Sequence, residues 1–186
     1  WKVGACCDTL GLNCSSFSAV QYFSNDDSVV AWWRLDEESG ALASDESANG
    51  NNGNLNGGLT LPGWEAGWIG GSLEFDGVDD FVEIPASPSL DAVADQPMTI
   101  LGVARLLQRG VAQVLVSRGE GSAGLSNVFY RISVNAEDRL VFGHRTWGGA
   151  AESSIDRDAS TVMITSDEPV PDGWFHFAAV REYGEE

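Results

Sequence analysis

The sequence carries very little positive charge, and lysine is almost absent. Ten of the 186 residues are Lys or Arg, against 28 Asp and Glu, which gives a formal net charge of −18, and Lys2 is the only lysine. Proteins bind nucleic-acid backbones through Lys/Arg patches, so we expect no nucleic-acid partner. Cations are the natural counterpart of such a surface, although an acid excess also keeps a secreted or salt-adapted protein soluble.

Cysteine and histidine are scarce as well. Cys6, Cys7 and Cys14 are the only cysteines, so the rest of the chain folds without a crosslink. Three cysteines at this spacing predict one disulfide to Cys14 in an oxidising compartment, with one thiol left over. The two histidines, His144 and His176, have no paired spacing, which disfavours a zinc site.

Long hydrophobic runs are also missing. No stretch approaches the ~20 consecutive apolar residues of a membrane helix, so no membrane insertion is expected. No segment has a convincing helical period, and no internal repeat of about 20 to 50 residues is visible, which disfavours solenoids and propellers.

What the sequence does contain is a series of short β-branched and aromatic runs separated by turn residues. This spacing predicts an all-β fold, an antiparallel two-sheet sandwich, over residues 29–186, preceded by an N-terminal arm or linker over residues 1–28. Residues 98–107 also suit a short helix. The expected strands are residues 29–35, 72–75, 81–84, 98–107, 112–118, 128–134, 139–144, 161–165 and 174–181.

Two segments between these runs have distinctive turn chemistry. Residues 36–58 are rich in Gly and Asn, which tolerate left-handed backbone, so they are predicted to form a compact loop of turns. In the run FDGVDDFVEIP, the Asp76-Gly77 pair is typical of a hairpin turn between two strands that carry Phe75 and Phe81. The carboxylates of Asp76, Asp79 and Asp80 therefore crowd one turn.

From residue 29 onward the order of motifs resembles the laminin G-like, or concanavalin A-like lectin/glucanase, domain. The motifs are VVAWWRLDEESG, DESANGNNGNL, FDGVDDFVEIP and GWFHFAAVRE. The resemblance implies a jelly-roll β-sandwich of secreted or surface proteins that bind glycans, matrix or partner proteins, often with calcium at one rim. Such domains usually continue past the last motif, which implies that the closing strands are missing from residues 29–186 and that a sheet edge is open.

The same resemblance suggests a calcium site assembled from separate loops. Calcium takes six to eight oxygen ligands, which acidic turns and backbone carbonyls supply. The alternative is that these side chains only cap their turns. The expected metal ligands are Asp36, Asp45 and Asn49 from the Gly/Asn segment, converging on Asp76, Asp79 and Asp80.

The seven tryptophans of the sequence are candidates for contact with a ligand. An indole face stacks well on the apolar face of a pyranose ring, although most tryptophans pack in protein cores. Trp64, Trp68 and Trp147 fall in expected loops and are the candidate ligand-binding residues, with simple loop packing as the alternative.

Some of the proteins that the motifs resemble hydrolyse glycosides, but the acidic residues of this chain do not match the pattern that this reaction needs. Retaining glycosidases need two carboxyl groups ~5 Å apart. Glu74 and Asp76 fit the first two places of an E-x-D-x-E strand, but Val78 occupies the third. The sequence therefore predicts a noncatalytic extracellular or cell-surface module for recognition or adhesion, which binds a glycan or an extracellular protein through rim loops with calcium support. The alternative is a structural subunit or decoration of an extracellular assembly such as a filament, which self-associates through residues 1–28 or the open sheet edge.

Overall fold

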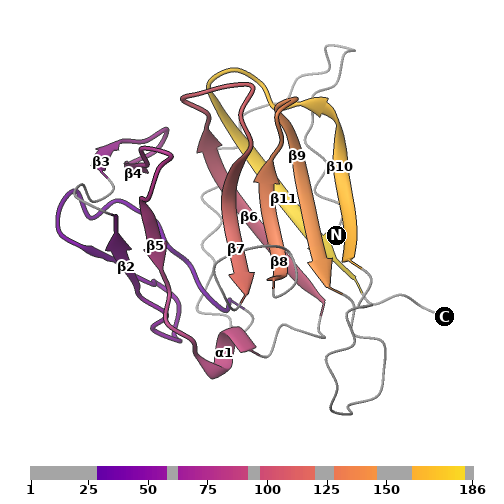
Figure 1. Cartoon of the computed structure of the whole chain (residues 1–186). Coiled ribbons are helices and arrows are strands. Elements are labelled where there is room, and N and C mark those ends of the chain that lie inside the picture. The colour runs from indigo at the N-terminus through magenta and orange to yellow at the C-terminus, as the bar shows by residue number, and fades with distance from the viewer. Residues whose placement is uncertain (1–28, 58–62, 92–96, 120–127, 146–160, 183–186) are drawn as a thin grey trace, which may run out of the picture. The chain divides into compact units, whose positions relative to one another are not determined.

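The computed structural model describes residues 29–57, 63–91, 97–119, 128–145 and 161–182 (Figure 1). In these residues the regular structure is almost entirely antiparallel β-strand, which confirms the predicted all-β class. The one helix described, α1 (Pro88–Asp91), has four residues. None of the described segments forms a helix long and apolar enough to cross a membrane.

The chain divides between Ala92 and Val93 into two compact units. We call them the N-terminal unit and the C-terminal unit and describe each by itself. Nothing in the sequence pattern indicated this division, and the single domain expected over residues 29–186 stays a prediction.

The C-terminal unit is β-sandwich-like, with two antiparallel sheets (Figure 1). One sheet has the strand order β10-β9-β8-β7, and the other pairs β11 with β6. Of residues 98–107, which also suited a helix, Met98–Arg105 form a strand. The bounds are β6 (Met98–Arg105), β7 (Gln113–Gly119), β8 (Val128–Val134), β9 (Arg139–Arg145), β10 (Thr161–Pro169) and β11 (Trp174–Arg181).

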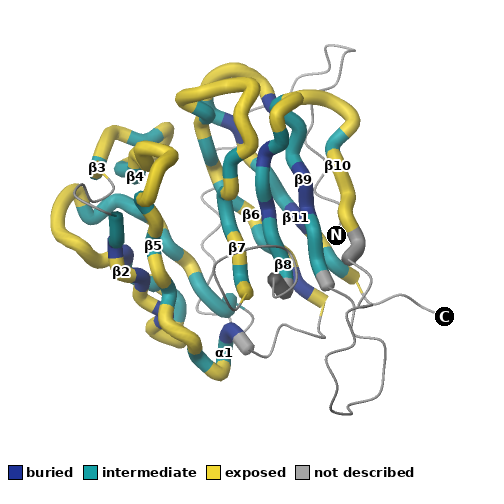
Figure 2. The backbone as a smooth tube through the Cα atoms, in the orientation of Figure 1, coloured by how far each residue is buried: buried dark blue, intermediate teal, exposed yellow. Residues whose placement is uncertain are grey.

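One apolar cluster joins the two sheets of this unit. Met98 and Ala179 come from the two-stranded sheet, and Ile132 and Phe142 come from the four-stranded sheet. Along β6, buried or half-buried positions alternate with exposed ones, as the two-residue period of a strand requires. Figure 2 shows the buried positions of β8 and β9 in dark blue. The sheets are therefore held together by apolar side chains.

A glycine makes room for an aromatic ring inside this core. Gly102 of β6 lies directly opposite Phe177 of β11. A Cβ atom built on Gly102 would stand 2.6 Å from Phe177 Cζ. The ring therefore occupies the space that any larger residue at position 102 would need.

Arg109 links three turns at one end of the C-terminal unit through ion pairs and hydrogen bonds. Its guanidinium pairs with Asp138 at 3.1 Å and with Asp172 at 2.8 Å. It also donates hydrogen bonds to the backbone carbonyls of Val170 and Pro171. These contacts join the loop after β6 to the β8–β9 turn and to the loop before β11.

The N-terminal unit is built from shorter strands. A three-stranded sheet has the order β1-β2-β5, and β3 and β4 form a separate two-stranded hairpin. The bounds are β1 (Leu42–Ala43), β2 (Gly53–Asn56), β3 (Gly63–Ala66), β4 (Gly71–Glu74) and β5 (Phe81–Glu83).

The expected strand over residues 29–35 is wrong. Only Trp33 forms a bridge, an isolated one with Asp45. Polar side chains take the place of a neighbouring strand: Asp45 accepts the Trp32 N–H, and the Val30 carbonyl accepts hydrogen bonds from Ser47 and Asn51. The Gly/Asn segment therefore binds this run through side chains, which satisfies the backbone without a ladder.

The predicted loop over residues 36–58 and the hairpin around Asp76-Gly77 are also wrong in part. The loop contains β1 and β2, because Ala43 and Leu55 are buried and the strand pairing outweighs the turn preference of Gly and Asn. The acidic turn does connect two strands, but β4 pairs with β3 and β5 pairs with β2. The turn is therefore a link between two sheets.

Candidate functional site

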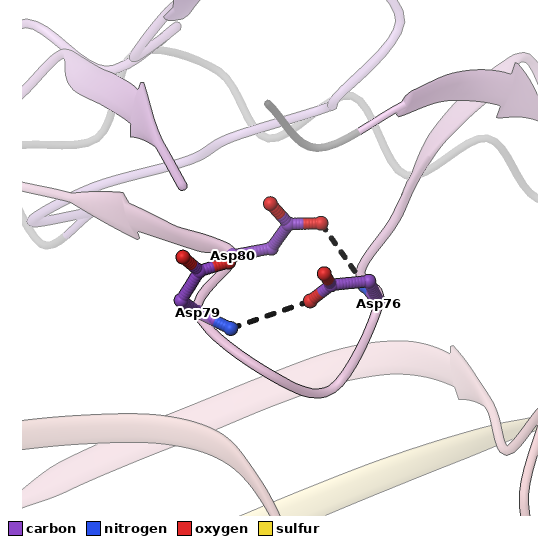
Figure 3. A group of neighbouring side chains, drawn as sticks. All are labelled: Asp76, Asp79 and Asp80. Carbon is purple, nitrogen blue, oxygen red and sulfur yellow. Dashed lines mark hydrogen bonds between the residues drawn. The ribbon is translucent and has the colours of Figure 1, made fainter. Parts of the chain in front are cut away.

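The candidate site is the turn between β4 and β5 in the N-terminal unit (Figure 3). Asp76 Oδ1 accepts hydrogen bonds from the backbone N–H groups of Val78, at 2.8 Å, and Asp79, at 3.3 Å. Asp80 Oδ2 accepts one from the Asp76 N–H at 3.0 Å. Gly77 has a φ of 76°, in the left-handed region that glycine favours. One carboxylate oxygen of each aspartate thereby lies within 4.8 Å of the others.

The backbone of the turn keeps it negatively charged. The hydrogen bond from the Val78 N–H, aided by the other backbone donors of the turn, outweighs burial and lowers the pKa of Asp76 below its ordinary 3.8. Asp80 Oδ1 is buried and has no hydrogen-bond partner in the described part of the chain. A buried carboxylate oxygen without a partner is unfavourable, and a cation would provide one.

The donor set of this turn fits a hard divalent cation such as calcium. Calcium prefers oxygen ligands, and carboxylates with nearby backbone carbonyls and water complete its shell. The carboxylate of Asp79 makes none of the hydrogen bonds that shape the turn. Asp79 is therefore the residue best placed to serve a cation without loss of the local fold.

The other three expected ligands have different partners. Asp36 forms an ion pair with Arg34 at 2.7 Å. Asp45 accepts hydrogen bonds from Trp32 and from Ser47 and Asn51 of its own loop. Asn49 donates to two backbone carbonyls. In the described residues, the neighbouring carboxylates that could share a metal include neither Asp36 nor Asp45. The structure therefore brings together only the three aspartates of the β4–β5 turn.

The predicted ligand-binding tryptophans differ from one another. Trp68, in the turn of the β3–β4 hairpin, is 53% exposed. Trp64 is half-buried, and its indole N–H donates to the Gly40 carbonyl at 2.8 Å, so it attaches the hairpin to the preceding loop. The predictions that lie outside the described residues are Trp147, the arm over residues 1–28, and its Cys6, Cys7 and Cys14.

Three apolar side chains accompany the carboxylates at the surface. Phe75, Val78 and Phe81 are 42%, 85% and 51% exposed, and Figure 2 shows the backbone here as largely exposed. The hairpin interpretation placed Phe75 and Phe81 on two strands joined by the acidic turn, without predicting their exposure. The acidic residues between Phe75 and Phe81 are the feature of the sequence that indicates exposure of this turn to water.

Comparison with known proteins adds no family. No protein-family model matches the chain, and neither a curated protein nor a solved structure matches it significantly. The laminin G-like resemblance stays a prediction.

Proposed function

We propose that this chain is a noncatalytic recognition or adhesion module of an extracellular or cell-surface protein. It binds a glycan or another extracellular protein through exposed loops, with calcium held at the β4–β5 turn, on a jelly-roll sandwich of the laminin G-like kind. The observation that carries the proposal is the group of three carboxylates within 4.8 Å of one another, beside exposed Phe75, Val78 and Phe81.

Calcium would act here by organising the turn. Asp76, Asp79 and Asp80 would hold the ion, and their mutual repulsion would be relieved by its charge. A turn fixed in this way presents its apolar side chains in one conformation, which lowers the entropic cost of binding a partner. Trp68 remains a proposed contact for a sugar ring because its indole is exposed.

The charge distribution of the chain supports a cation at this unit. Residues 6–92 contain 15 acidic residues and one basic residue, Arg34. Arg34 is itself paired with Asp36. The negative field of this unit therefore attracts cations toward its exposed loops.

Calorimetric titration with calcium tests the metal. The variants are Asp79→Asn, which removes one carboxylate of the group, and Glu83→Gln, which removes an exposed charge outside it. We expect saturable binding to the unmodified chain, at least about tenfold weaker binding to Asp79→Asn, and little change in Glu83→Gln. Absence of binding at millimolar calcium, or equal weakening in both variants, would overturn the metal site.

Recognition is tested separately on immobilised glycans and matrix proteins. Val78→Ser removes the most exposed apolar group of the turn while it keeps the three carboxylates. We expect capture in calcium, reduced capture in chelator, and reduced capture by Val78→Ser with calcium binding intact. Capture that is unaffected by both changes would remove this turn from the recognition surface.

A structural subunit of an extracellular assembly is the second candidate, because β6 and β11 carry exposed apolar residues. Leu101 is 67%, Val103 45% and Val180 37% exposed on the face away from the core. Light scattering at increasing concentration distinguishes the candidates. A concentration-dependent mass that Leu101→Lys abolishes would favour the assembly, and a constant monomer mass would exclude self-association through this face.

A further inference from the structure

The inner face of the four-stranded sheet ends in a row of ionisable side chains. Arg118 of β7 lies directly opposite Tyr130 of β8, and Tyr130 lies opposite His144 of β9. The adjacent pair, Ile132 and Phe142, belongs to the core. Side chains alternate along a strand and directly opposite residues share a face, so Arg118, Tyr130 and His144 are on the core side. We call these three residues the polar row.

The two-stranded sheet adds a fourth polar residue at the same end of the sandwich. Ala179 faces the core, so Arg181, two residues later and opposite Met98, is on the same face. The opposite end of the sandwich is where the Val170 N–H donates to the Asp138 carbonyl, which joins the loop between β10 and β11 to the β8–β9 turn. Arg181, at the far end of β11, therefore lies toward the polar row.

The polar row is partly buried against the apolar core. Burial raises the pKa of Tyr130, and the positive charge of Arg118 opposes this increase. His144 packs with its ring 5.5 Å from that of Phe142. Its Nδ1 atom is buried and lacks a hydrogen-bond partner among the residues that the structure describes. A ligand atom that bonded this nitrogen would remove an unfavourable buried polar group.

We propose that the polar row and Arg181 form a binding site for the carboxylate of a small ligand, independent of the calcium turn. Guanidinium groups match a carboxylate in a bidentate fashion, and the tyrosine hydroxyl and an imidazole N–H add further donors. Both arginines also have interactions within the chain, so a carboxylate joins or displaces them. A singly charged carboxylate suits the site better than phosphate or sulfate, because a chain of net charge −18 repels multivalent anions more strongly.

The two histidines of the chain make imidazole NMR a direct readout of this site. His144 belongs to the polar row, whereas His176 is exposed on β11 and faces away from the core. The full chain, labelled at histidine with ¹⁵N, is titrated at constant pH and ionic strength with three probes. Sodium glucuronate tests a sugar acid, N-acetylglycine tests a peptide-type carboxylate, and glucose is the neutral control.

We expect a saturable shift of the His144 signals with a carboxylate probe, no shift with glucose, and no change at His176. The probe with the lower half-saturation concentration identifies the source of the carboxylate. No shift at His144, equal shifts at both histidines, or an equal response to glucose would overturn the site.

A matched pair of variants tests the role of the polar row. Arg118→Gln should raise the half-saturation concentration roughly tenfold. Arg105→Gln should leave it unchanged, because Arg105 is exposed and its guanidinium lies 5.1 Å from the Trp174 ring centroid on the outer face. Equal effects of the two variants would contradict the proposal. If Arg118→Gln does not fold, the test is whether the His144 signals of the unmodified chain shift on titration with a carboxylate probe.

Discussion

The two units of this chain differ sharply in charge. Residues 6–92 contain 15 acidic residues against one arginine, whereas residues 93–186 contain 13 against eight arginines. The acidic residues are divided almost evenly, so the difference lies in the arginines. With 15 acidic residues and one arginine, residues 6–92 carry a formal charge of 1 − 15 = −14, and few cationic side chains are available to neutralise carboxylates such as those of the β4–β5 turn.

The interiors differ as well. The C-terminal unit packs two sheets around Met98, Ile132, Phe142 and Ala179. Among its described residues, the N-terminal unit buries few apolar side chains, and the buried Asn51 stands at the centre of a hydrogen-bond network. Apolar packing therefore stabilises one unit, and bonds between side chains and backbone stabilise much of the other.

The largest expected effect is the loss of an aromatic side chain from the C-terminal core. Phe142→Ala should destabilise this unit by about 3–5 kcal/mol, because it removes buried apolar surface and leaves a cavity. Ile164→Ala is the matched control, because Ile164 lies opposite Phe142 but is 57% exposed, and should cost about 1 kcal/mol or less. Urea unfolding measures both, and equal costs would refute the assignment of the core.

The counterpart in the N-terminal unit is a polar substitution. Asn51→Ala should cost about 2–3 kcal/mol, because the Asn51 side chain bonds the Val30 carbonyl and the hydroxyls of Ser87 and Ser89. Asn54→Ala, at an exposed position of β2, should stay within about 0.5 kcal/mol. Hydrogen exchange resolved by peptide should place the loss in residues 29–57. A small effect of Asn51→Ala would mean that the network is dispensable.

A glycine substitution tests how the β3–β4 hairpin packs on the chain before it. A Cβ atom at Gly71 would lie 2.8 Å from Asp36 Cα and from the Leu35 carbonyl oxygen. Because these are backbone atoms, Gly71→Ala should cost about 1–3 kcal/mol. Gly63→Ala, where no atom lies within 4 Å, should change the midpoint of unfolding very little. Equal midpoints for the two variants would contradict this packing.

Acid should weaken the N-terminal unit through Asp45. Burial raises the pKa of Asp45, but hydrogen bonds from Trp32, Ser47 and Asn51 outweigh it and leave the pKa below its ordinary 3.8. A carboxyl with a lowered pKa in the folded state stabilises the fold above pH 3.8, and this contribution is lost as the pH falls through the folded value. Unfolding between pH 5 and about 2 should therefore show a smaller loss of stability in Asp45→Asn than in the unmodified chain. Parallel curves would exclude this role of Asp45.

Sequence alone predicted the long strands of the C-terminal unit well. Residues 128–134 and 174–181 form β8 and β11 with the predicted bounds, because their β-branched and aromatic residues match a core between two sheets. The short strands β1, β2 and β3 were missed. β1 has only two residues, and Gly and Asn predominate in β2. β3, which reads GWEA, becomes a strand by pairing with β4 across a short turn. The aromatic run at 29–35 was misread, because Asp45 and Asn51 bind its backbone through side chains.

The candidate sites were predictable only where the sequence spacing is short. Asp76, Asp79 and Asp80 lie in one turn, so their proximity follows from the sequence itself. Asp36 could not be placed without knowledge of its ion pair with Arg34. The polar row could not be predicted from the sequence, because Arg118, Tyr130 and His144 come together only through the register of three strands.

Hydrogen exchange in calcium and in excess chelator, resolved by peptide over both units, tests the central claim most directly. The claim is that calcium binds the β4–β5 turn of the acidic N-terminal unit. It predicts that calcium slows exchange in peptides covering residues 74–83 and leaves β8, β9 and β11 unchanged, and that Asp79→Asn loses this response while Glu83→Gln keeps it. Equal exchange in calcium and chelator at residues 74–83, or slowing confined to the C-terminal unit, would contradict it.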